Sequence, residues 1–323
     1  MATISGLEIR RKSATPGSGA TPLTGAPARP DVTVSKLVDI DLCIGCKACE
    51  IACKEWNELG VDPTSNFGSY QSHQDLTPNT WDLMRFNEVD LPDGGLAWLI
   101  RKDSCLHCEE PGCLLACPAP GAVVQYTNGI VDFDHDKCIG CQYCIAGCPF
   151  DIPRFDAGTA KVYKCTMCAD RIADGMAPAC AKACPTGSIL FGTKEEMTDY
   201  GTNKVAKLQA RGFDDAMLYD PSGVGGVHMM YVVPRGNLLT EYGLPVAPDV
   251  RGVTTWHGAV SNLRRVGAVA LWAGVIGSLL YWLRTGRHRT PPEEVAVAEA
   301  TERESAPTDT TGQMDVAASR DLS

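Results

Sequence analysis

Residues 138–149 read CIGCQYCIAGCP, a run with cysteines spaced C-x2-C-x2-C-x3-C and proline after the last. Residues 43–53 repeat this cysteine spacing. Two variants widen the middle gap, to four residues in 105–117 and to eleven in 165–184. The four runs use all 16 cysteines of the chain, namely Cys43, Cys46, Cys49, Cys53, Cys105, Cys108, Cys113, Cys117, Cys138, Cys141, Cys144, Cys148, Cys165, Cys168, Cys180 and Cys184.

This spacing is typical of iron–sulfur proteins. Three closely spaced thiolates on one loop wrap a [4Fe–4S] cluster, and in two-cluster ferredoxins the fourth cysteine ligates the other cluster. Proline follows the fourth cysteine in three runs, as in the bacterial ferredoxin signature, whereas Lys54 follows Cys53 in the first run. The runs therefore predict four [4Fe–4S] clusters, without deciding which cysteines share one.

Two other uses of sixteen cysteines are disfavoured. Zinc sites also accept four cysteines, but they pair two Cys-x-x-Cys knuckles and leave the third closely spaced cysteine without a role. A scattered disulfide framework lacks this regularity.

Length, composition and charge set further limits. A chain of 323 residues has room for about two domains, and its 44% hydrophobic content excludes a wholly disordered protein. The net charge is −10, so the chain has no excess of basic residues with which to bind nucleic acid. Residues 290–323 are the most acidic segment, with eight acidic and two basic residues.

The segments around the runs predict short β elements, and hence an α+β fold of ferredoxin-like units. Residues 122–126 and 130–133 form a hairpin pattern around Asn128-Gly129. Strands are also expected at 96–100, 188–191 and 227–233. Thr193 and Glu196 form a capping-box pattern, which predicts a helix over 193–211.

Both ends of the chain differ from this pattern. Residues 1–35 are rich in Pro, Gly, Ser and Thr and predict an extended arm. Arg10 and Arg11 lack the following apolar stretch that a twin-arginine signal needs. Residues 286–323 predict an acidic disordered tail.

Residues 266–283, VGAVALWAGVIGSLLYWL, contain no charged side chain. A helix of this length spans roughly 27 Å, close to the hydrocarbon thickness of a bilayer. We therefore predict one transmembrane anchor within 258–285. Two arginines precede the span and three follow it closely, which favours a cytoplasmic C-terminus and an outward-facing cysteine region. Without its own signal, that region would cross the membrane folded, carried by a signal-bearing partner.

The sequence contains no G-x-G-x-x-G motif and no P-loop, so we interpret the chain as an electron relay between a donor and an acceptor. Candidate residues for tuning the cluster potentials are His107, Lys161, Lys164 and Arg171. His228 is interpreted as a structural histidine.

The runs and the segments between them resemble the β (iron–sulfur) subunit of membrane-bound respiratory formate dehydrogenase. The resemblance includes the C-terminal anchor and is carried by Cys43–Cys49 with Lys54–Asn57, Trp98–Asp103, Cys138–Phe150, Pro185–Gly187 with Phe191–Lys194, Ile9–Thr15 and Gly223–Tyr231.

The resemblance implies how the clusters are shared. One set would be Cys43, Cys46, Cys49 and Cys184, a second Cys53, Cys165, Cys168 and Cys180, a third Cys105, Cys108, Cys113 and Cys148, and a fourth Cys117, Cys138, Cys141 and Cys144. The second two-cluster unit (93–160) is then nested within the first (36–192), and 193–257 form a helix-and-strand extension.

The resemblance also implies partners. A catalytic subunit with a molybdenum or tungsten bis-pterin centre would oxidise formate, and a cytochrome b subunit would pass the electrons to quinone. The complex would be a hetero-oligomer in the cytoplasmic membrane. The alternatives are the equivalent subunit of another molybdenum oxidoreductase or of a membrane-bound hydrogenase, and a zinc-bound scaffold.

Overall fold

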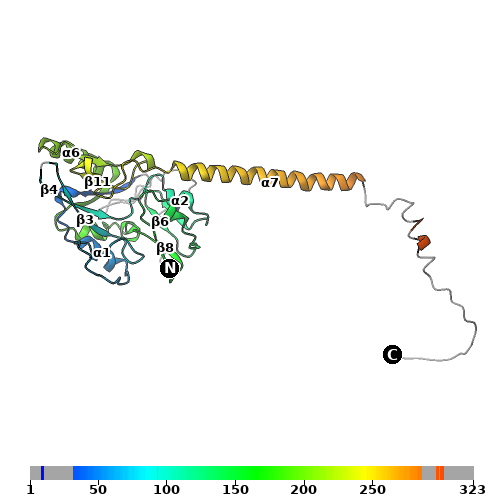
Figure 1. The fold of residues 1–323 in the computed structure, drawn as a ribbon, viewed down its shortest axis with the longest axis horizontal. Coiled ribbons are helices and arrows are strands. Elements are labelled where there is room, and N and C mark those ends of the chain that lie inside the picture. Colours follow the sequence, from blue (N-terminus) through cyan, green and yellow to red (C-terminus); the bar gives the residue numbers. More distant parts are fainter. Residues whose placement is uncertain (1–8, 11–31, 93, 286–295, 298, 302–323) are drawn as a thin grey trace, which may run out of the picture. The chain divides into compact units, whose positions relative to one another are not determined.

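Strand β2 (Val34–Asp39) is fully buried and lies inside a four-stranded sheet. It pairs antiparallel with β9 (Ile189–Thr193) and parallel with β11 (Met229–Val233), and β10 (Met217–Tyr219) pairs with β11 at the edge. In this computed structural model the described residues are 9–10, 32–92, 94–285, 296–297 and 299–301 (Figure 1). The sheet therefore joins segments from both ends of the cysteine region.

Helix α6 (Lys194–Ala210) packs on this sheet. The predicted capping box is confirmed, because the Thr193 hydroxyl accepts from the Glu196 N–H at 3.1 Å and the Glu196 carboxylate accepts from the Thr193 N–H at 2.9 Å. Gly201 brings the helix close to the sheet, since a Cβ there would lie 2.6 Å from a methyl carbon of Leu218. The predicted strand at 227–233 is also confirmed, beginning at Met229.

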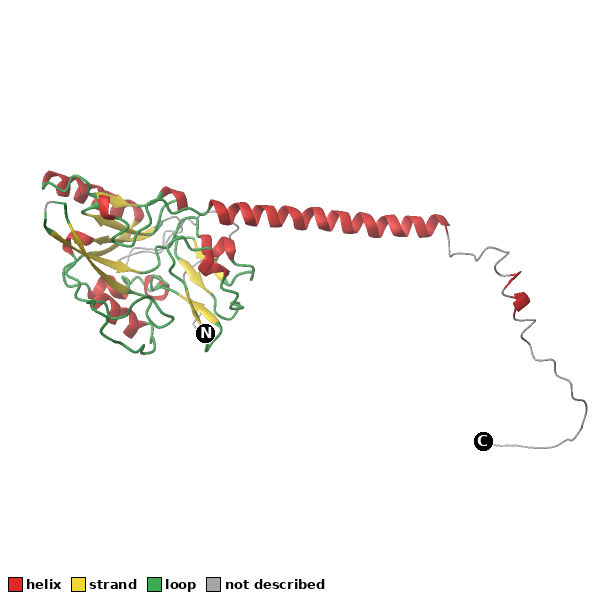
Figure 2. Cartoon of the chain, viewed as in Figure 1, coloured by secondary structure: helices red, strands yellow, loops and turns green. Residues whose placement is uncertain are grey.

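Three small antiparallel hairpins lie between the cysteine runs (Figure 2). They are β3 (Leu83–Asp90) with β4 (Leu96–Asp103), β5 (Val123–Tyr126) with β6 (Val131–Phe133), and β7 (Arg154–Asp156) with β8 (Lys161–Tyr163). The predicted strands at 96–100, 122–126 and 130–133 are confirmed. Strand β1 (Ile9–Arg10), from the predicted arm, pairs with β5, while most of that arm lies outside the described residues.

Each cysteine run contributes at least one short helix. Helix α1 (Ala48–Trp56) of the first run packs on α5 (Ala179–Ala183) of the last run. Helix α2 (Gly112–Ala116) of the second run packs on α3 (Tyr143–Ala146) of the third, and α4 (Ala169–Ala173) follows Cys168. The inner two runs thus pair with each other, and the outer two do the same.

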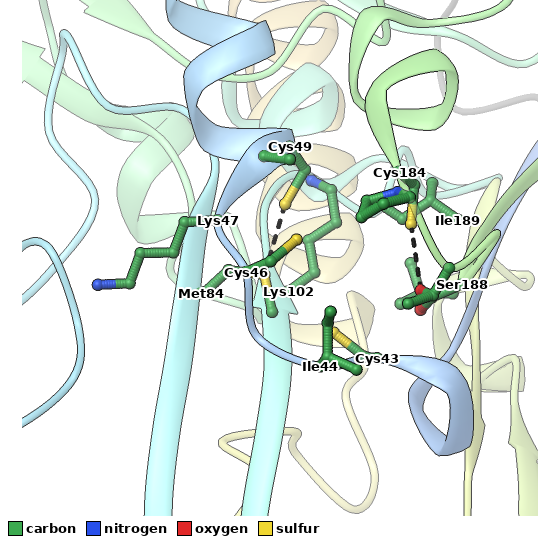
Figure 3. A pocket seen from close by; sticks show the side chains of 14 residues that line it. Cys43, Ile44, Cys46, Lys47, Cys49, Met84, Lys102, Cys184, Ser188 and Ile189 are labelled. Atoms are coloured by element: carbon green, nitrogen blue, oxygen red, sulfur yellow. Dashed lines mark hydrogen bonds between the residues drawn. The ribbon is translucent and has the colours of Figure 1, made fainter.

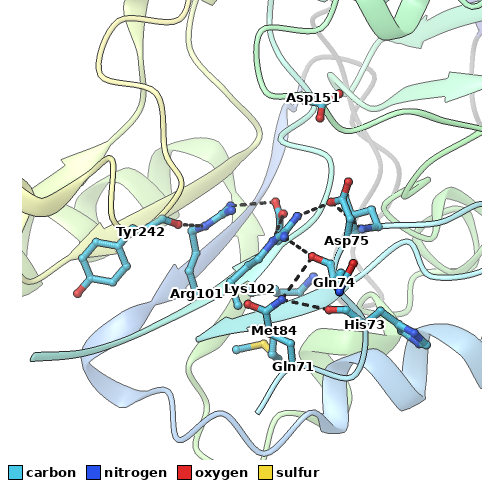
Figure 4. Close-up of polar contacts among 12 residues, drawn as sticks. Gln71, His73, Gln74, Asp75, Met84, Arg101, Lys102, Asp151 and Tyr242 are labelled. Atoms are coloured by element: carbon cyan, nitrogen blue, oxygen red, sulfur yellow. Dashed lines mark hydrogen bonds and ion pairs between the residues drawn. The ribbon is translucent and has the colours of Figure 1, made fainter. Parts of the chain in front are cut away.

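An ion-pair network ties the β3–β4 hairpin to the loop near residue 242. The Asp103 carboxylate accepts hydrogen bonds from the guanidinium nitrogens Nε of Arg85, at 2.8 Å, and Nη1 of Arg101, at 2.9 Å. Arg101 also donates to the backbone oxygen of Tyr242 (Figure 4). This buried guanidinium therefore connects the cysteine region to the chain that leads to the last long helix.

Helix α7 (Arg251–Thr285) begins before the predicted anchor and ends at its predicted limit. Its segment Val266–Arg284 is 19 residues long and apolar enough to cross a bilayer, and none of it is buried in the chain's own structure. The chain divides into two units, residues 1–260 and 261–323. Most of the predicted acidic tail lies outside the described residues, and 296–297 and 299–301 are helical.

Candidate iron–sulfur sites

Four cysteines from the first and last runs line one cavity. Cys43, Cys46 and Cys49 come from the loop before α1 and its first turn, and Cys184 caps the end of α5 (Figure 3). The Cys49 sulfur lies 3.5 Å from the sulfur of Met84 on β3. Residues 135 or more positions apart in the chain therefore meet at this cavity.

A second cavity is lined by Cys105, Cys108, Cys113 and Cys148. Cys105 and Cys108 belong to the loop after β4, Cys113 to α2, and Cys148 follows α3. Three of the four thiols are buried. Again three cysteines come from one run and the fourth from its partner run, the pattern of two-cluster ferredoxins.

The remaining eight cysteines line neither cavity, and their electrostatic neighbours divide them into two further groups. Burial raises the pKa of Cys144 to about 12, and the neighbouring thiols of Cys117, Cys138 and Cys141 contribute to the rise.

The other group surrounds Cys168. Burial likewise raises the pKa of Cys168 to about 12, with contributions from Cys180 and Cys165. The pKa of Cys53 is raised by burial, by the Asp82 carboxylate and by the neighbouring Cys165 thiol. Because thiols must lose their protons to bind iron, cluster assembly at these buried sites is coupled to proton release.

The lysine that replaces proline after Cys53 has a structural reason. Cys117 and Cys184 are the C-caps of α2 and α5, where a following proline ends the helix. Cys53 instead lies within α1, which continues to Trp56, so a proline would break it. Lys54 donates to the backbone oxygens of Gly60 and Asn79, at 3.0 and 2.7 Å.

Two buried lysines beside the thiols were missed by the sequence analysis. The Lys36 ammonium lies 3.9 Å from the sulfurs of both Cys165 and Cys180. Lys102 lines the first cavity and pairs with the buried Asp82 at 2.6 Å. The sequence gives little signal for them, since Lys102 lies between Arg101 and Asp103 and Lys36 shares its strand with Ser35 and Asp39.

The thiols explain the state of Lys36. Burial would lower the pKa of Lys36, but the neighbouring Cys165 and Cys180 thiolates outweigh this and raise it. The ammonium form is therefore the stable one beside deprotonated thiols.

The proposed tuning residues occupy different surroundings. His107 and Lys164 line the second cavity. Lys161 donates to the backbone oxygen of Cys138. The Arg171 guanidinium stacks 4.2 Å from the ring centre of Trp56 and donates to the Ala177 oxygen.

His228 has the structural contacts expected of it. Its Nδ1 lies 2.8 Å from the Val34 oxygen, and its Nε2 lies 2.5 Å from the Glu109 carboxylate.

Among the described residues, no three Cys, His, Asp or Glu side chains converge closely enough to hold a single metal ion. The thiols instead surround two cavities and form two further groups. Four sulfur donors around one space, with buried ammonium groups nearby, fit a [4Fe–4S] cluster, which is larger than one ion and negatively charged with its thiolates.

Comparison with known proteins gives the same assignment. Two models of a 4Fe-4S dicluster domain match residues 42–122 and 96–194. The formate dehydrogenase-O iron-sulfur subunit of Escherichia coli (strain K12) is 48% identical over 92% of this chain and 97% of its own length. The chain belongs to the iron–sulfur subunits of formate dehydrogenase.

Other iron–sulfur subunits of formate dehydrogenase are similar too. That of Haemophilus influenzae is 51% identical over 83% of this chain and 86% of its own length. The formate dehydrogenase 2 subunit beta (cytochrome c-553) of Nitratidesulfovibrio vulgaris is 34% identical over 60% of this chain and 91% of its own. Two dicluster domains and sixteen cysteines fit the four predicted [4Fe–4S] clusters. The iron–sulfur subunit thus has an electron-transfer role within a multi-subunit complex.

Proposed function

We propose that this chain relays electrons from a formate-oxidising catalytic subunit through four [4Fe–4S] clusters to a membrane cytochrome b, which passes them to quinone. The observation that carries the proposal is the pairing of distant cysteine runs around shared cavities, in a chain whose relatives are formate dehydrogenase iron–sulfur subunits. Bound [4Fe–4S] clusters supply one-electron redox chemistry. The chain itself contributes no catalytic residue.

We assign the sixteen cysteines to four ligand sets, and the placement of the thiols supports this assignment. The two cavities supply Cys43, Cys46, Cys49 and Cys184, and Cys105, Cys108, Cys113 and Cys148. The two remaining groups supply Cys53, Cys165, Cys168 and Cys180, and Cys117, Cys138, Cys141 and Cys144.

Protein groups around these sets prepare the sites for negatively charged cofactors. The packed cores around α1 with α5 and α2 with α3 restrict the access of water to the thiols. Buried ammonium groups such as Lys36 offset the negative charge of the thiolates. Both features set reduction potentials by burial and charge.

The partners follow from the same proposal. The donor is a catalytic subunit with a molybdenum or tungsten bis-pterin centre, and the acceptor is a cytochrome b subunit, in a hetero-oligomer held in the cytoplasmic membrane. The apolar segment of α7 supplies a single-pass anchor. The cysteine region then faces outward and the C-terminus lies in the cytoplasm, as the flanking arginines favour.

The test uses the complex purified anaerobically from detergent-solubilised membranes. Adding formate should bleach the broad visible absorbance of the clusters, and removing the catalytic subunit should abolish this response. If dithionite bleaches the clusters but formate does not, in a preparation with an active catalytic partner, the donor reaction is a different one. Metal and labile-sulfide analysis that finds zinc in place of iron and sulfide would exclude the relay altogether.

A further inference from the structure

His107 is completely buried and is one of the residues that line the cavity of Cys105, Cys108, Cys113 and Cys148. Its Nδ1 accepts a hydrogen bond from the Val131 N–H at 3.1 Å. A ring nitrogen that accepts a hydrogen bond carries no proton, so the proton of the neutral ring is on Nε2. His107 therefore presents one N–H donor at Nε2.

This N–H has no hydrogen-bond partner in the described part of the chain. Leaving a buried donor without a partner is energetically unfavourable, so its presence needs an explanation. The other such atoms are Oε1 of Gln125 and the two carboxylate oxygens of Asp82, of which Oδ1 lies 2.6 Å from the Lys102 ammonium. Neither Asp82 nor Gln125 lines one of the two cysteine cavities, whereas His107 does.

The chain contains its own comparison for this position. The residue before the second cysteine of each run is Gly45, His107, Gly140 or Met167, and all four have positive φ, of 65°, 49°, 69° and 56°. The four loops therefore share a left-handed turn, which non-glycine residues seldom adopt. Only the second run places a side-chain N–H there.

The loops of His107 and Met167 match most closely. The His107 N–H donates to the Cys105 sulfur at 3.4 Å, and the Met167 N–H donates to the Cys165 sulfur at 3.4 Å. Both side chains are fully buried. The two loops thus make the same backbone hydrogen bond to sulfur and differ in the side-chain donor.

We propose that His107 donates its Nε2–H to a sulfur of the cluster at this cavity, and that this bond raises the reduction potential of that cluster alone. Reduction adds negative charge to the cluster, and a hydrogen bond to its sulfur stabilises the more negative state. The inference rests on the proposed ligand set Cys105, Cys108, Cys113 and Cys148.

The β5–β6 hairpin holds the ring in this tautomer. The Val131 N–H bonds to Nδ1 of His107, and the Val131 oxygen accepts from the Lys164 ammonium at 2.6 Å. Lys164 also donates to the Cys165 oxygen at 3.0 Å. Val131 is therefore a positioning residue, fixed through both of its backbone polar groups.

The test compares His107→Met, His107→Gln and Met167→Leu in the purified complex, by EPR-monitored redox titration with dithionite. His107→Met copies the side chain that the chain already accepts at the matching turn, whereas glutamine retains an N–H donor. We expect the reduction potential of the cluster at the His107 cavity to fall in His107→Met and to recover partly in His107→Gln. The same potential should stay unchanged in Met167→Leu. The other three potentials should stay constant in both His107 variants.

Cys108→Ala identifies the affected cluster, since it removes a ligand of the same set. The proposal is overturned if His107→Met shifts no reduction potential, or if the potential falls as far in His107→Gln as in His107→Met. It is also overturned if the EPR signal that shifts in His107→Met is still present in Cys108→Ala. If Cys108→Ala retains all four clusters, the ligand set of the proposed function is wrong as well.

A measurement on the unsubstituted complex does not depend on any variant folding. Histidine labelled with ¹⁵N should give a weak hyperfine coupling to one reduced cluster in pulsed EPR. Absence of any histidine coupling would overturn the hydrogen bond directly, whatever the ligand sets are.

Discussion

Three lysines, Lys36, Lys102 and Lys164, are almost completely buried beside cysteine thiols. Buried ammonium groups are rare unless negative charge lies close by. Lys102 has a carboxylate partner in Asp82, whereas Lys36 lies against two cysteine sulfurs. The lysines are thus placed to balance thiolate charge, and each would influence the nearest cluster.

Lys36→Met should lower the reduction potential of the cluster proposed for Cys53, Cys165, Cys168 and Cys180. A unit charge 4 Å away contributes about 4 kcal/mol at an effective dielectric of 20. Because the added electron is shared over the whole cluster, we expect the reduced cluster to lose roughly 1–2 kcal/mol of stabilisation. This corresponds to a fall in reduction potential of roughly 45–90 mV for a one-electron couple. EPR redox titration measures the shift. The exposed Lys207→Met is the control, and an equal shift there would contradict the assignment.

The proposed sharing of cluster ligands between runs makes a second prediction at this scale. Cys46→Ala and Cys184→Ala should remove or convert the same cluster, because both thiols line one cavity. Cys180→Ala should affect a different cluster, although Cys180 and Cys184 belong to the same run. The EPR spectra of the reduced complexes compare the three variants. Loss of one common signal in Cys180→Ala and Cys184→Ala would favour ligation within single runs instead.

At the scale of elements, short helices and hairpins meet through small residues. A Cβ at Gly112 of α2 would lie 2.2 Å from the Gly147 oxygen just after α3, so these helix ends approach closely. The turn of the β5–β6 hairpin is equally tight, since a Cβ at Gly129 would lie 2.0 Å from the His228 ring. The hairpin that orients His107 is therefore itself held by close packing.

Gly129→Ala should destabilise the cysteine region more than Gly212→Ala. Both glycines have strongly positive φ, of 91° and 92°, and share the backbone strain of about 1 kcal/mol. Only Gly129 also faces a buried ring, which adds about 1–3 kcal/mol of overpacking. The urea concentration at which cluster absorbance is lost measures the order of stability. Equal midpoints for the two variants would show that the His228 contact is unimportant.

At the scale of the whole molecule, the chain combines a cysteine region with an apolar helix that its own structure leaves uncovered. Side chains such as Leu271, Trp272 and Leu279 are more than half exposed. A bilayer would remove this apolar surface from water. Attachment and orientation can therefore be tested separately from the clusters.

Val275→Arg should weaken membrane attachment. An arginine at the centre of a transmembrane helix costs about 2.5–3.5 kcal/mol on insertion. The measurement is the fraction of the chain that stays with membranes after an alkaline carbonate wash, with Val275→Leu as the control. Full retention of the arginine variant would mean that partner subunits alone hold the chain.

The proposed orientation predicts from which side of the membrane a protease can cleave a C-terminal tag. A protease-cleavable tag after Ser323 should be protected in intact spheroplasts and cleaved in inverted vesicles, because the arginine excess after the span favours a cytoplasmic C-terminus. A tag inside the cysteine region should give the reverse result. Cleavage of the C-terminal tag in intact spheroplasts would reverse the orientation.

The sequence alone determined the cofactor, because cluster ligation depends on cysteine spacing within a loop and that spacing is local. It also determined the capping box at Thr193, the Asn128-Gly129 hairpin and the apolar span, since each follows from a short pattern. Local spacing left open which runs pair, and the resemblance to a known family supplied that hypothesis.

Only the tertiary structure decided features that depend on distant segments meeting. It brought Cys184 to the loop of Cys43 and placed Lys36 of β2 against Cys165 and Cys180. It also left one nitrogen of His107 bonded and the other without a partner, which no local pattern encodes. The physical reason is that charge compensation and hydrogen bonding are set by distances in space, whereas the sequence fixes only distances along the chain.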